Sequence, residues 1–573
     1  MRALCTPLLL TLALASAGSV RALPDLGAEP CPRPPPGSAV PEPRDLRSRD
    51  GVLTLELTLR NHREADGSSR YCYTLPDGAQ SPTLRLHPGE LLVLRLKNEL
   101  TAPAPDSAAP AAHVHRTSGR SDVCNRGEMS STATNLHFHG LSVPPLCHQD
   151  EVLRTSLPSG GMFEYRVRIP ANEPPGLYWY HPHVHGFTTP QVLGGASGAL
   201  IIEGLERAIP EAAGLPERVL VIRDQDLLHP NAPPSKSEPV TPQILLDADG
   251  DAANTHTGYG KPAKDLSVNF VPVPYPDYPP ALIRVRPGEQ QLWRVLNASA
   301  VTYLHLALLF NQTAQQLGVV AIDGVPIDTR GGKAKSVAWA DHIGVPPGGR
   351  VEFIASAPPV GVSATLMTRS VDTGNGGEND PNRVLASIVA AADAPEPGSR
   401  LPLHPPPAAQ PSLGWLGNVA PVRVRKLYFS QNHTDPNDPR SPTVYYITEQ
   451  GKAPKLFDPG ATQADITVRQ GDVEDWIIEN RTQEVHAFHI HQVHFLLLDW
   501  FGLPVNEPFL RDTVNVPYYD PKMGRFPSVR LRMDFRDPAA VGTFVYHCHL
   551  LEHEDGGMMG TIRVEPLATP TRP

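Results

Sequence analysis

A turn-and-strand pattern that recurs three times constrains the fold of this 573-residue chain most strongly. In each copy an alternating run ends in a Pro-Gly or Gln-Gly turn, an acidic residue follows the glycine, and an asparagine closes the next apolar run nine residues after that glycine. The copies contain Gly89 and Asn98, Gly288 and Asn297, and Gly471 and Asn480. Such repetition predicts three similar β domains, and a hairpin type shared by unrelated β domains is the alternative.

Composition agrees with an all-β chain. Sixty-five prolines, only 6% aromatic residues and many short alternating runs between turns disfavour a helical protein. Length suggests about three or four domains. Composition predicts a signal segment at 1–22, β domains at 45–205, 206–394 and 421–566, a Pro- and Ala-rich linker at 395–420, and a surface insertion at 101–112.

The first 22 residues have the features of a secretory signal, with Arg2, an apolar run from Leu8 to Ala15 and small residues at the cleavage site. No other stretch is long and apolar enough to span a bilayer. We therefore expect an exported protein, periplasmic or extracellular, that acts as a monomer. The formal net charge of −10 and the absence of a basic stripe argue against nucleic-acid binding.

Near the C-terminus, we expect a strand from Gly542 to His549 that runs into a tight loop. Side chains alternate along a strand, so Cys548 faces one side while His547 and His549 face the other. The loop carries His553 and Met558 on a path that can return to the Cys548 side.

A cysteine, a methionine and two histidines form the ligand set of a blue-copper electron-transfer site. His486 is an odd number of residues before His489, so it faces the Cys548 side and can supply the second imidazole. A buried free cysteine flanked by surface histidines is the alternative.

Four His-x-His pairs supply further imidazoles. On a strand, the two side chains of a pair lie on one face, roughly 6.5 Å apart, which suits two neighbouring ions better than one ion. The pairs are His137/His139, His181/His183, His489/His491 and His547/His549. Two pairs come from the first predicted domain and two from the third, so a shared site must lie between these domains, and imidazole-rich sites of this kind suit copper.

Other histidines match these patterns less well. His113 and His115 lie in low-complexity sequence and are expected at the surface. His305 is expected to be packed or exposed. His148, His185 and His494 are close to the candidate ligands in sequence but off pattern, which indicates supporting or solvent-facing roles.

Four cysteines remain if Cys5 leaves with the signal and Cys548 is a ligand. In an exported protein, Cys31, Cys72, Cys124 and Cys147 allow up to two disulfides in three pairings. A bond between Cys124 and Cys147, which bracket the first histidine pair, is favoured, and free thiols are the alternative.

The motifs Leu136-His-Phe-His-Gly140, Trp179-Tyr-His-Pro-His183, His486-x-x-His-x-His491 and His547-Cys-His-Leu-Leu-Glu-His553 with Met558 together resemble those of the multicopper oxidases. The chain looks most like the three-domain bacterial laccases and copper-efflux oxidases. The resemblance covers nearly the whole mature chain and implies three cupredoxin-like Greek-key β-sandwich or barrel domains, with no copper ligand in the middle one.

The resemblance also implies four copper ions and the ligands of each. A type 1 copper, which takes electrons from the substrate, would be bound by His486, Cys548, His553 and axial Met558. A type 2 copper would be bound by His137 and His489. A type 3 pair would be bound by His139, His181, His183, His491, His547 and His549. Methionine rather than leucine as the axial ligand implies a type 1 potential at the lower end of the family's range.

Reduction of O2 also needs protons. Glu554, directly after His553, matches the family's proton-donating acid, and a plain loop carboxylate is the alternative. Asp150 is the candidate acid near the first histidine pair. Compared with the family's pattern, this sequence has extra residues, Leu146 to His148, before it. Asp512 is expected to orient a ligand imidazole, and an acid at a strand end is the alternative.

The leading hypothesis for function is a laccase-like oxidation of phenols and aromatic amines coupled to reduction of O2 to water. A metal oxidase for Cu(I) or Fe(II), bilirubin-type oxidation and a non-enzymatic protein with a dead site are the alternatives. Eight methionines without a cluster beyond 558–559 count against Cu(I). A ferroxidase would need a cluster of carboxylates beside His486, which a sequence alone cannot show. The presence of all candidate ligands counts against a dead site.

Overall fold

The computed structural model of the chain describes residues 29–64, 67–102, 123–124, 129–234, 245–246, 251–327, 337–403, 414–435, 437–438 and 441–567. The predicted signal segment at 1–22 lies outside these residues, as do His113, His115 and most of the insertion at 101–112. Among the described residues, no helix combines the length and the apolar character that crossing a membrane requires.

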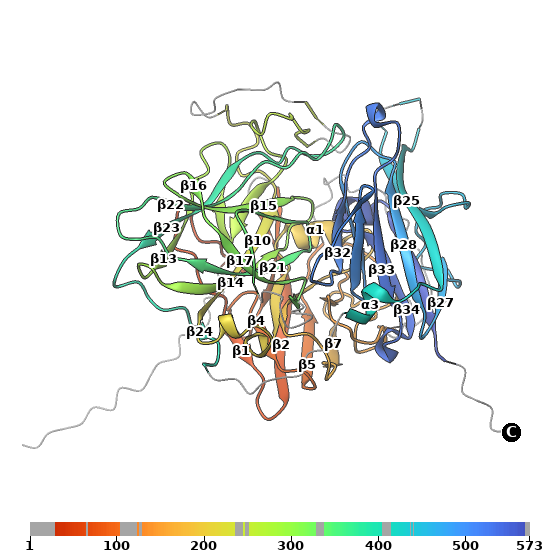
Figure 1. The fold of residues 1–573 in the computed structure, drawn as a ribbon, viewed down its shortest axis with the longest axis horizontal. Helices are drawn as coiled ribbons and strands as arrows, with labels where there is room; N and C mark the ends of the chain where they lie inside the picture. Colours follow the sequence, from red (N-terminus) through yellow and green to blue (C-terminus); the bar gives the residue numbers. More distant parts are fainter. Residues whose placement is uncertain are drawn as a thin grey trace, which may run out of the picture.

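Each sheet takes its strands from one of three consecutive parts of the chain, which we call the N-terminal part (β1–β9), the middle part (β10–β24) and the C-terminal part (β25–β35). The C-terminal part lies in blue on one side of the molecule in Figure 1, and the middle part lies in green on the other. The all-β prediction is confirmed, because the helices in the described residues are short.

The N-terminal part has two sheets. One has the order β1 (Asp45–Arg47), β4 (Thr83–Leu86), β9 (Gly198–Ile202), β8 (Gly176–His181), β6 (His137–His139). The other has the order β3 (Ser69–Thr74), β2 (Val52–Arg63), β5 (Leu91–Asn98), β7 (Met162–Arg168).

The middle part also has two sheets. One has the order β12 (Val271–Val273), β11 (Asp265–Val268), β10 (Pro216–Gln225), β14 (Gln290–Asn297), β21 (Arg350–Ser356), β17 (Leu317–Ile322), β18 (Val325–Pro326), with β19 (Ala338–Ala340) on β17 and β24 (Ser399–Arg400) on β10. The other has the order β13 (Ala281–Val285), β23 (Arg383–Ala390), β22 (Ala364–Thr368), β15 (Leu304–Phe310), β16 (Thr313–Ala314), with β20 (Ile343–Val345) on β15.

The C-terminal part completes the set. One sheet has the order β26 (Thr443–Glu449), β25 (Arg423–His433), β28 (Val473–Asn480), β33 (Ser528–Asp534), β30 (Phe495–Trp500), β31 (Leu503–Pro504). The other has the order β27 (Ile466–Arg469), β35 (Met559–Glu565), β34 (Gly542–Cys548), β29 (His486–Ile490), β32 (Thr513–Val516). The helices are α1 (Thr188–Leu193), α2 (Leu205–Ala208), α3 (Gly414–Asn418) and α4 (Leu551–Asp555), with 3-10 turns at Pro210–Ala212, Pro521–Met523 and Pro538–Ala540.

The repeated sequence pattern occupies the same place in each part. Its second strand pairs in parallel with the strand that comes first in the sequence of the same sheet. The pairs are β5 with β2, β14 with β10, and β28 with β25. The closing asparagine is buried, its amide donates to two backbone carbonyls, and its Oδ1 accepts a backbone N–H two residues later. These contacts are made by Asn98, Asn297 and Asn480. The three parts therefore share one construction, although the predicted domain boundaries stay a prediction, and β24 lies inside the predicted linker.

Apolar contacts pack the three parts against one another. Each part has its own large core, and smaller clusters cross between parts. One cluster joins Val192 of the N-terminal part, Val301 of the middle part and Leu551 of the C-terminal part, and another joins Val152 to Met559. This packing brings the histidine-bearing strands of the N-terminal and C-terminal parts next to each other.

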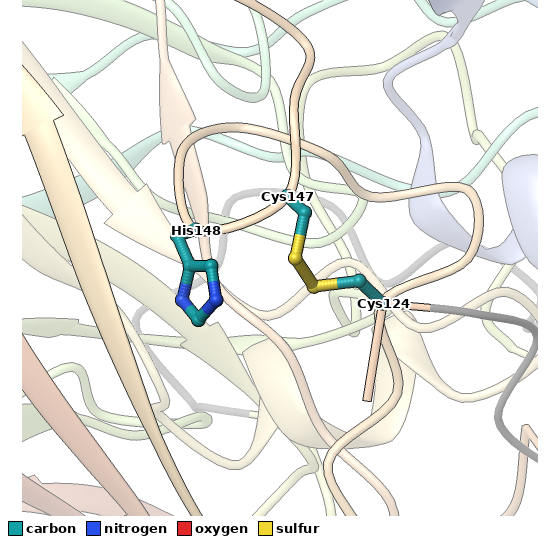
Figure 2. Close-up of side chains that lie close together, drawn as sticks. All are labelled: Cys124, Cys147 and His148. Carbon is teal, nitrogen blue, oxygen red and sulfur yellow. A yellow bond between two sulfur atoms is a disulfide. The ribbon is translucent and has the colours of Figure 1, made fainter. Parts of the chain in front are cut away.

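The described residues contain two disulfides, both within residues 31–147. The favoured pair Cys124–Cys147 is confirmed, with Cα atoms 5.6 Å apart, and Cys31 is bonded to Cys72. Figure 2 shows the Cys124–Cys147 bond with His148 beside it. The two sulfurs are bonded to each other, so this Cys-Cys-His group does not offer thiolates to a metal ion.

Candidate metal centre

Cys548, at the end of β34, meets two imidazoles in the interior of the C-terminal part. Its Sγ lies 3.5 Å from His486 Nδ1 and 3.8 Å from His553 Nδ1, and these two nitrogens are 3.1 Å apart. Met558 packs in the same buried cluster as Cys548, and its carbonyl accepts the Cys548 N–H at 3.1 Å. The structure therefore places the thiol, both imidazoles and the methionine together, as the alternation along the strand predicts.

The four His-x-His pairs meet between the N-terminal and C-terminal parts. His137 stacks on His491 with ring centroids 3.8 Å apart, and His139 stacks on His489 at 3.9 Å. All eight side chains of the pairs are at most 2% exposed. Donor atoms within 4.8 Å of one another define the groups His137/His489/His491, His137/His139/His181 and His183/His491/His547.

Strand register produces this convergence. On β34 and β29, His547 lies opposite His489, while Cys548 lies opposite Phe488 on the other face. On β6 and β8, His137 lies opposite His181. The strand predicted to reach His549 ends at Cys548, because the chain turns there toward α4. The His549 N–H still donates to Ala487 O at 2.6 Å, so its side chain keeps the direction that a strand would give it.

The imidazoles present bare nitrogens to one another, which is what a metal site requires. His137 Nε2, His139 Nδ1, His181 Nε2 and His489 Nε2 have no hydrogen-bond partner among the described residues. The other nitrogen of each of these rings is held by a carboxylate or a carbonyl: Asp150, Asp512, Pro182 O and Asp512 O. Buried polar atoms without partners are costly, and a ring fixed by one nitrogen and open at the other is typical of metal-binding histidines.

Burial sets the protonation of these groups. Desolvation, reinforced by neighbouring imidazoles, lowers the pKa of His139, His181 and His549 well below the ordinary histidine value. These rings are therefore neutral, which is the form that binds a metal ion. Desolvation also raises the pKa of the Cys548 thiol, so a thiolate at this position needs a cation beside it.

Comparison with known proteins decides the family. Two sequence models described as multicopper oxidase match residues 106–207 and 436–568, the stretches that contain all the candidate ligands. The multicopper oxidase mco of Staphylococcus aureus is 24% identical over 438 residues, covering 75% of this chain and 76% of that protein. The chain belongs to the multicopper oxidase family. It is an oxidoreductase, and its resident metal is copper.

Two other multicopper oxidases illustrate how far the similarity extends. A laccase of Bacillus subtilis is 25% identical over 427 residues, covering 70% of this chain and 73% of that protein. A solved multicopper oxidase of Campylobacter jejuni, described as a metallo-oxidase, superimposes with a TM-score of 0.61 at 23% identity, covering 93% of this chain and 96% of that chain. The likeness to the solved structure establishes the three-domain cupredoxin fold.

Two acids predicted for this multicopper oxidase contact ligand histidines. Asp150 Oδ1 lies 2.9 Å from His137 Nδ1, and the Asp150 carboxylate also accepts the Gln492 amide at 2.6 Å. Asp512 Oδ1 lies 3.2 Å from His139 Nε2. Both acids therefore orient imidazoles from outside the cluster. The extra residues before Asp150 form a turn, and the Asp150 N–H donates a hydrogen bond to Pro144 O across it.

Glu554 lies on α4, against the opposite end of the cluster. Its Oε2 is 3.2 Å from His547 Nδ1, its Oε1 is 3.5 Å from His183 Nδ1, and Thr188 Oγ1 donates to it at 3.2 Å. Desolvation, followed by the charge of Asp555, raises the pKa of this carboxyl well above the ordinary value. A carboxyl with a raised pKa beside two candidate ligands is suited to deliver a proton to the cluster.

Two side chains around the Cys548 site were not predicted from the sequence. Glu484 Oε1 lies 3.4 Å from His553 Nε2 and 3.8 Å from His486 Nε2. The Tyr445 ring stacks on the His553 ring with centroids 4.1 Å apart. Glu484 precedes His486 by two residues, so strand alternation could have placed it on the His486 side. Tyr445 belongs to a distant strand and has no such signal.

The off-pattern histidines contact other groups. His148 Nδ1 donates to Glu164 O at 2.7 Å, and His185 packs against Phe457. His494 Nε2 donates to Asp323 O at 3.1 Å, and His305 packs against His342. Each has a packing or hydrogen-bonding role, in agreement with the sequence analysis.

Proposed function

We propose that this protein oxidises a small donor one electron at a time at the Cys548 site and reduces O2 to two waters at the cluster of eight imidazoles. The observation that supports the proposal most is that Cys548 is the direct sequence neighbour of His547 and His549. The Cys548 site and the imidazole cluster are therefore joined through adjacent residues of the backbone, which gives electrons a short covalent route. Four copper ions, one of type 1, one of type 2 and a type 3 pair, would supply the one-electron and O2 chemistry. The residues that would hold them are those assigned from the family resemblance.

The protein's own groups prepare both sites. Burial keeps His139, His181 and His549 neutral, and several rings of the cluster present nitrogens without hydrogen-bond partners among the described residues, so they need little rearrangement to accept metal. Asp150 and Asp512 fix the rings of His137 and His139. Glu554 holds a proton next to His547 and His183, where the reduction of O2 consumes protons.

The donor that the geometry supports best is a small metal cation, Fe(II), rather than a phenol. Glu484 places a carboxylate against the outer nitrogen of both imidazoles at the Cys548 site. The His553 side chain is 1% exposed and Glu484 is 6% exposed, and Tyr445 covers the face of His553, which leaves an aromatic donor little imidazole surface to contact. Carboxylate oxygen suits a harder cation such as Fe(II), whereas Cu(I) prefers thioether and thiolate sulfur. The reaction is then four Fe(II), one O2 and four protons giving four Fe(III) and two waters.

Phenol oxidation, the leading hypothesis from the sequence, is the second candidate. The named laccase relative and the absence of a methionine cluster support it. An exported location is part of the proposal, and the two disulfides support it because such bonds persist in oxidising compartments.

Replacing Glu484 by glutamine separates the two donors. We expect E484Q to lower kcat/KM for Fe(II) by at least about 10-fold, because it removes the charge that attracts and holds the cation. The value for an uncharged phenol should change by less than about 3-fold, since a neutral donor gains little from that charge. The measurement is steady-state O2 consumption with each donor, using E565Q at the exposed end of β35 as the matched control.

Two results would count against a cationic donor. One is wild-type protein that oxidises the phenol far faster than Fe(II), which would favour the laccase-like reaction. The other is an equal loss of both activities in E484Q, which would mean that Glu484 only positions the two imidazoles.

A further inference from the structure

Arg350, the first residue of β21, reaches the copper cluster from the middle part, which carries no candidate ligand. Its guanidinium donates from Nη1 to Asp512 Oδ1 at 2.8 Å and from Nη2 to Asp512 Oδ2 at 2.6 Å. Both side chains are at most 1% exposed. We propose that Arg350 is a positioning residue of the cluster, which holds the Asp512 carboxylate toward His139 Nε2 so that His139 presents Nδ1 to copper.

The tautomer of His139 follows from what a carboxylate can do. An ionised carboxylate only accepts hydrogen bonds, so His139 must carry its proton on Nε2, the atom that lies 3.2 Å from Asp512 Oδ1. The lone pair is then on Nδ1, which has no hydrogen-bond partner among the described residues.

The guanidinium is itself fixed by all three parts of the protein. Arg350 Nε donates to Leu177 O of the N-terminal part at 3.1 Å, and Nη1 donates to Gly348 O of the middle part at 3.2 Å. The pair with Asp512 supplies the contact to the C-terminal part. A planar fork held in this way has little freedom to turn, so it fixes the direction of the carboxylate.

Two glycines leave room for this arrangement. Gly140, next to His139, has a φ of +88°, and a Cβ there would overlap Arg350 Nη2 and lie 2.7 Å from Asp512 Oδ2. Gly348 has a φ of +78°, and a Cβ there would lie 2.7 Å from His549 Nε2. The turn before β21 thus enters the cluster closely enough to touch one candidate ligand and to fix another through Asp512.

The test measures how much copper the R350M variant binds. It rests on one part of the proposed function, namely that the wild-type protein binds copper at the cluster. We expect R350M to bind copper at the eight-imidazole cluster about 10–100-fold more weakly, and because His139 is assigned to the type 3 pair, copper analysis should show fewer copper ions per chain. The blue absorption per chain should be unchanged, because none of the described Arg350 contacts involves His486, Cys548 or His553. R350K, which keeps the charge but not the paired hydrogen bonds, should recover part of the cluster copper and serves in place of R350M if that variant does not fold.

R294M and R294K are the matched controls. Arg294 is also fully buried in the middle part and is paired with Glu217 and Glu352, away from Asp512. These variants should keep the cluster copper. Full cluster copper in R350M, or an equal loss in the Arg294 variants, would overturn the inference. Wild-type protein without cluster copper would instead refute the proposed function.

Discussion

Cys548→Ser should abolish the blue absorption and reduce donor-dependent O2 consumption to the rate without enzyme. A serine hydroxyl does not provide the soft thiolate that the His486–His553 site needs. Without a metal at this site, the covalent route from Cys548 to His547 and His549 would receive no electrons from the donor. Absorption spectroscopy, copper analysis and an oxygen electrode measure the three consequences, and the copper content should fall by one ion per chain.

Met558→Leu is the control for the cysteine variant. It alters the same buried cluster but leaves the thiolate and both imidazoles in place. We expect it to keep the blue absorption and to raise the potential of the site, since the axial ligand tunes that potential. A C548S protein that keeps both colour and turnover would show that Cys548 is only a buried core residue.

Glu554→Gln should slow O2 turnover by about 10²–10⁴-fold, the range expected when a positioned proton donor is lost. Glutamine keeps the shape of the side chain but cannot release a proton beside His547 and His183. Anaerobic reduction of the blue site by the donor should proceed at the wild-type rate, because Glu554 lies against the cluster and not against Cys548. Stopped-flow absorption without O2 and steady-state turnover with O2 separate the two steps.

Glu552→Gln tests whether any acid on α4 has the same effect. Glu552 lies two residues before Glu554 but faces Lys264, with its Oε1 3.5 Å from the Lys264 Nζ. E552Q should turn over O2 at close to the wild-type rate. Wild-type turnover in E554Q, or an equal loss in E552Q, would contradict a proton-donating role for Glu554.

The alternation of side chains explains why so much of the centre could be predicted from the sequence. Cys548 faces away from His547 and His549 because successive residues of β34 do so, and the same rule places His486 on the Cys548 side. The repeated turn and its closing asparagine identified three alike β units because Asn98, Asn297 and Asn480 make the same loop contacts. Local geometry sufficed in each case.

Contacts between distant parts could not be predicted in this way. Arg350 reaches Asp512 across 162 residues of chain, and no spacing in the sequence relates the two. Tyr445 covers His553 from another strand. Strand alternation could have placed Glu484 on the His486 side. Its contact with His553 depends on where α4 lies, which the alternation does not predict. These contacts bear on donor choice and ring orientation, which is why the sequence identified the metal centre more sharply than the substrate.

The most direct test of the two-site centre is copper analysis of the wild-type protein together with its absorption and electron paramagnetic resonance spectra. We predict four copper ions per chain, an intense blue absorption from the Cys548 site, and separate type 1 and type 2 signals. A protein that is colourless when loaded, or that holds a single copper ion per chain, would contradict this prediction.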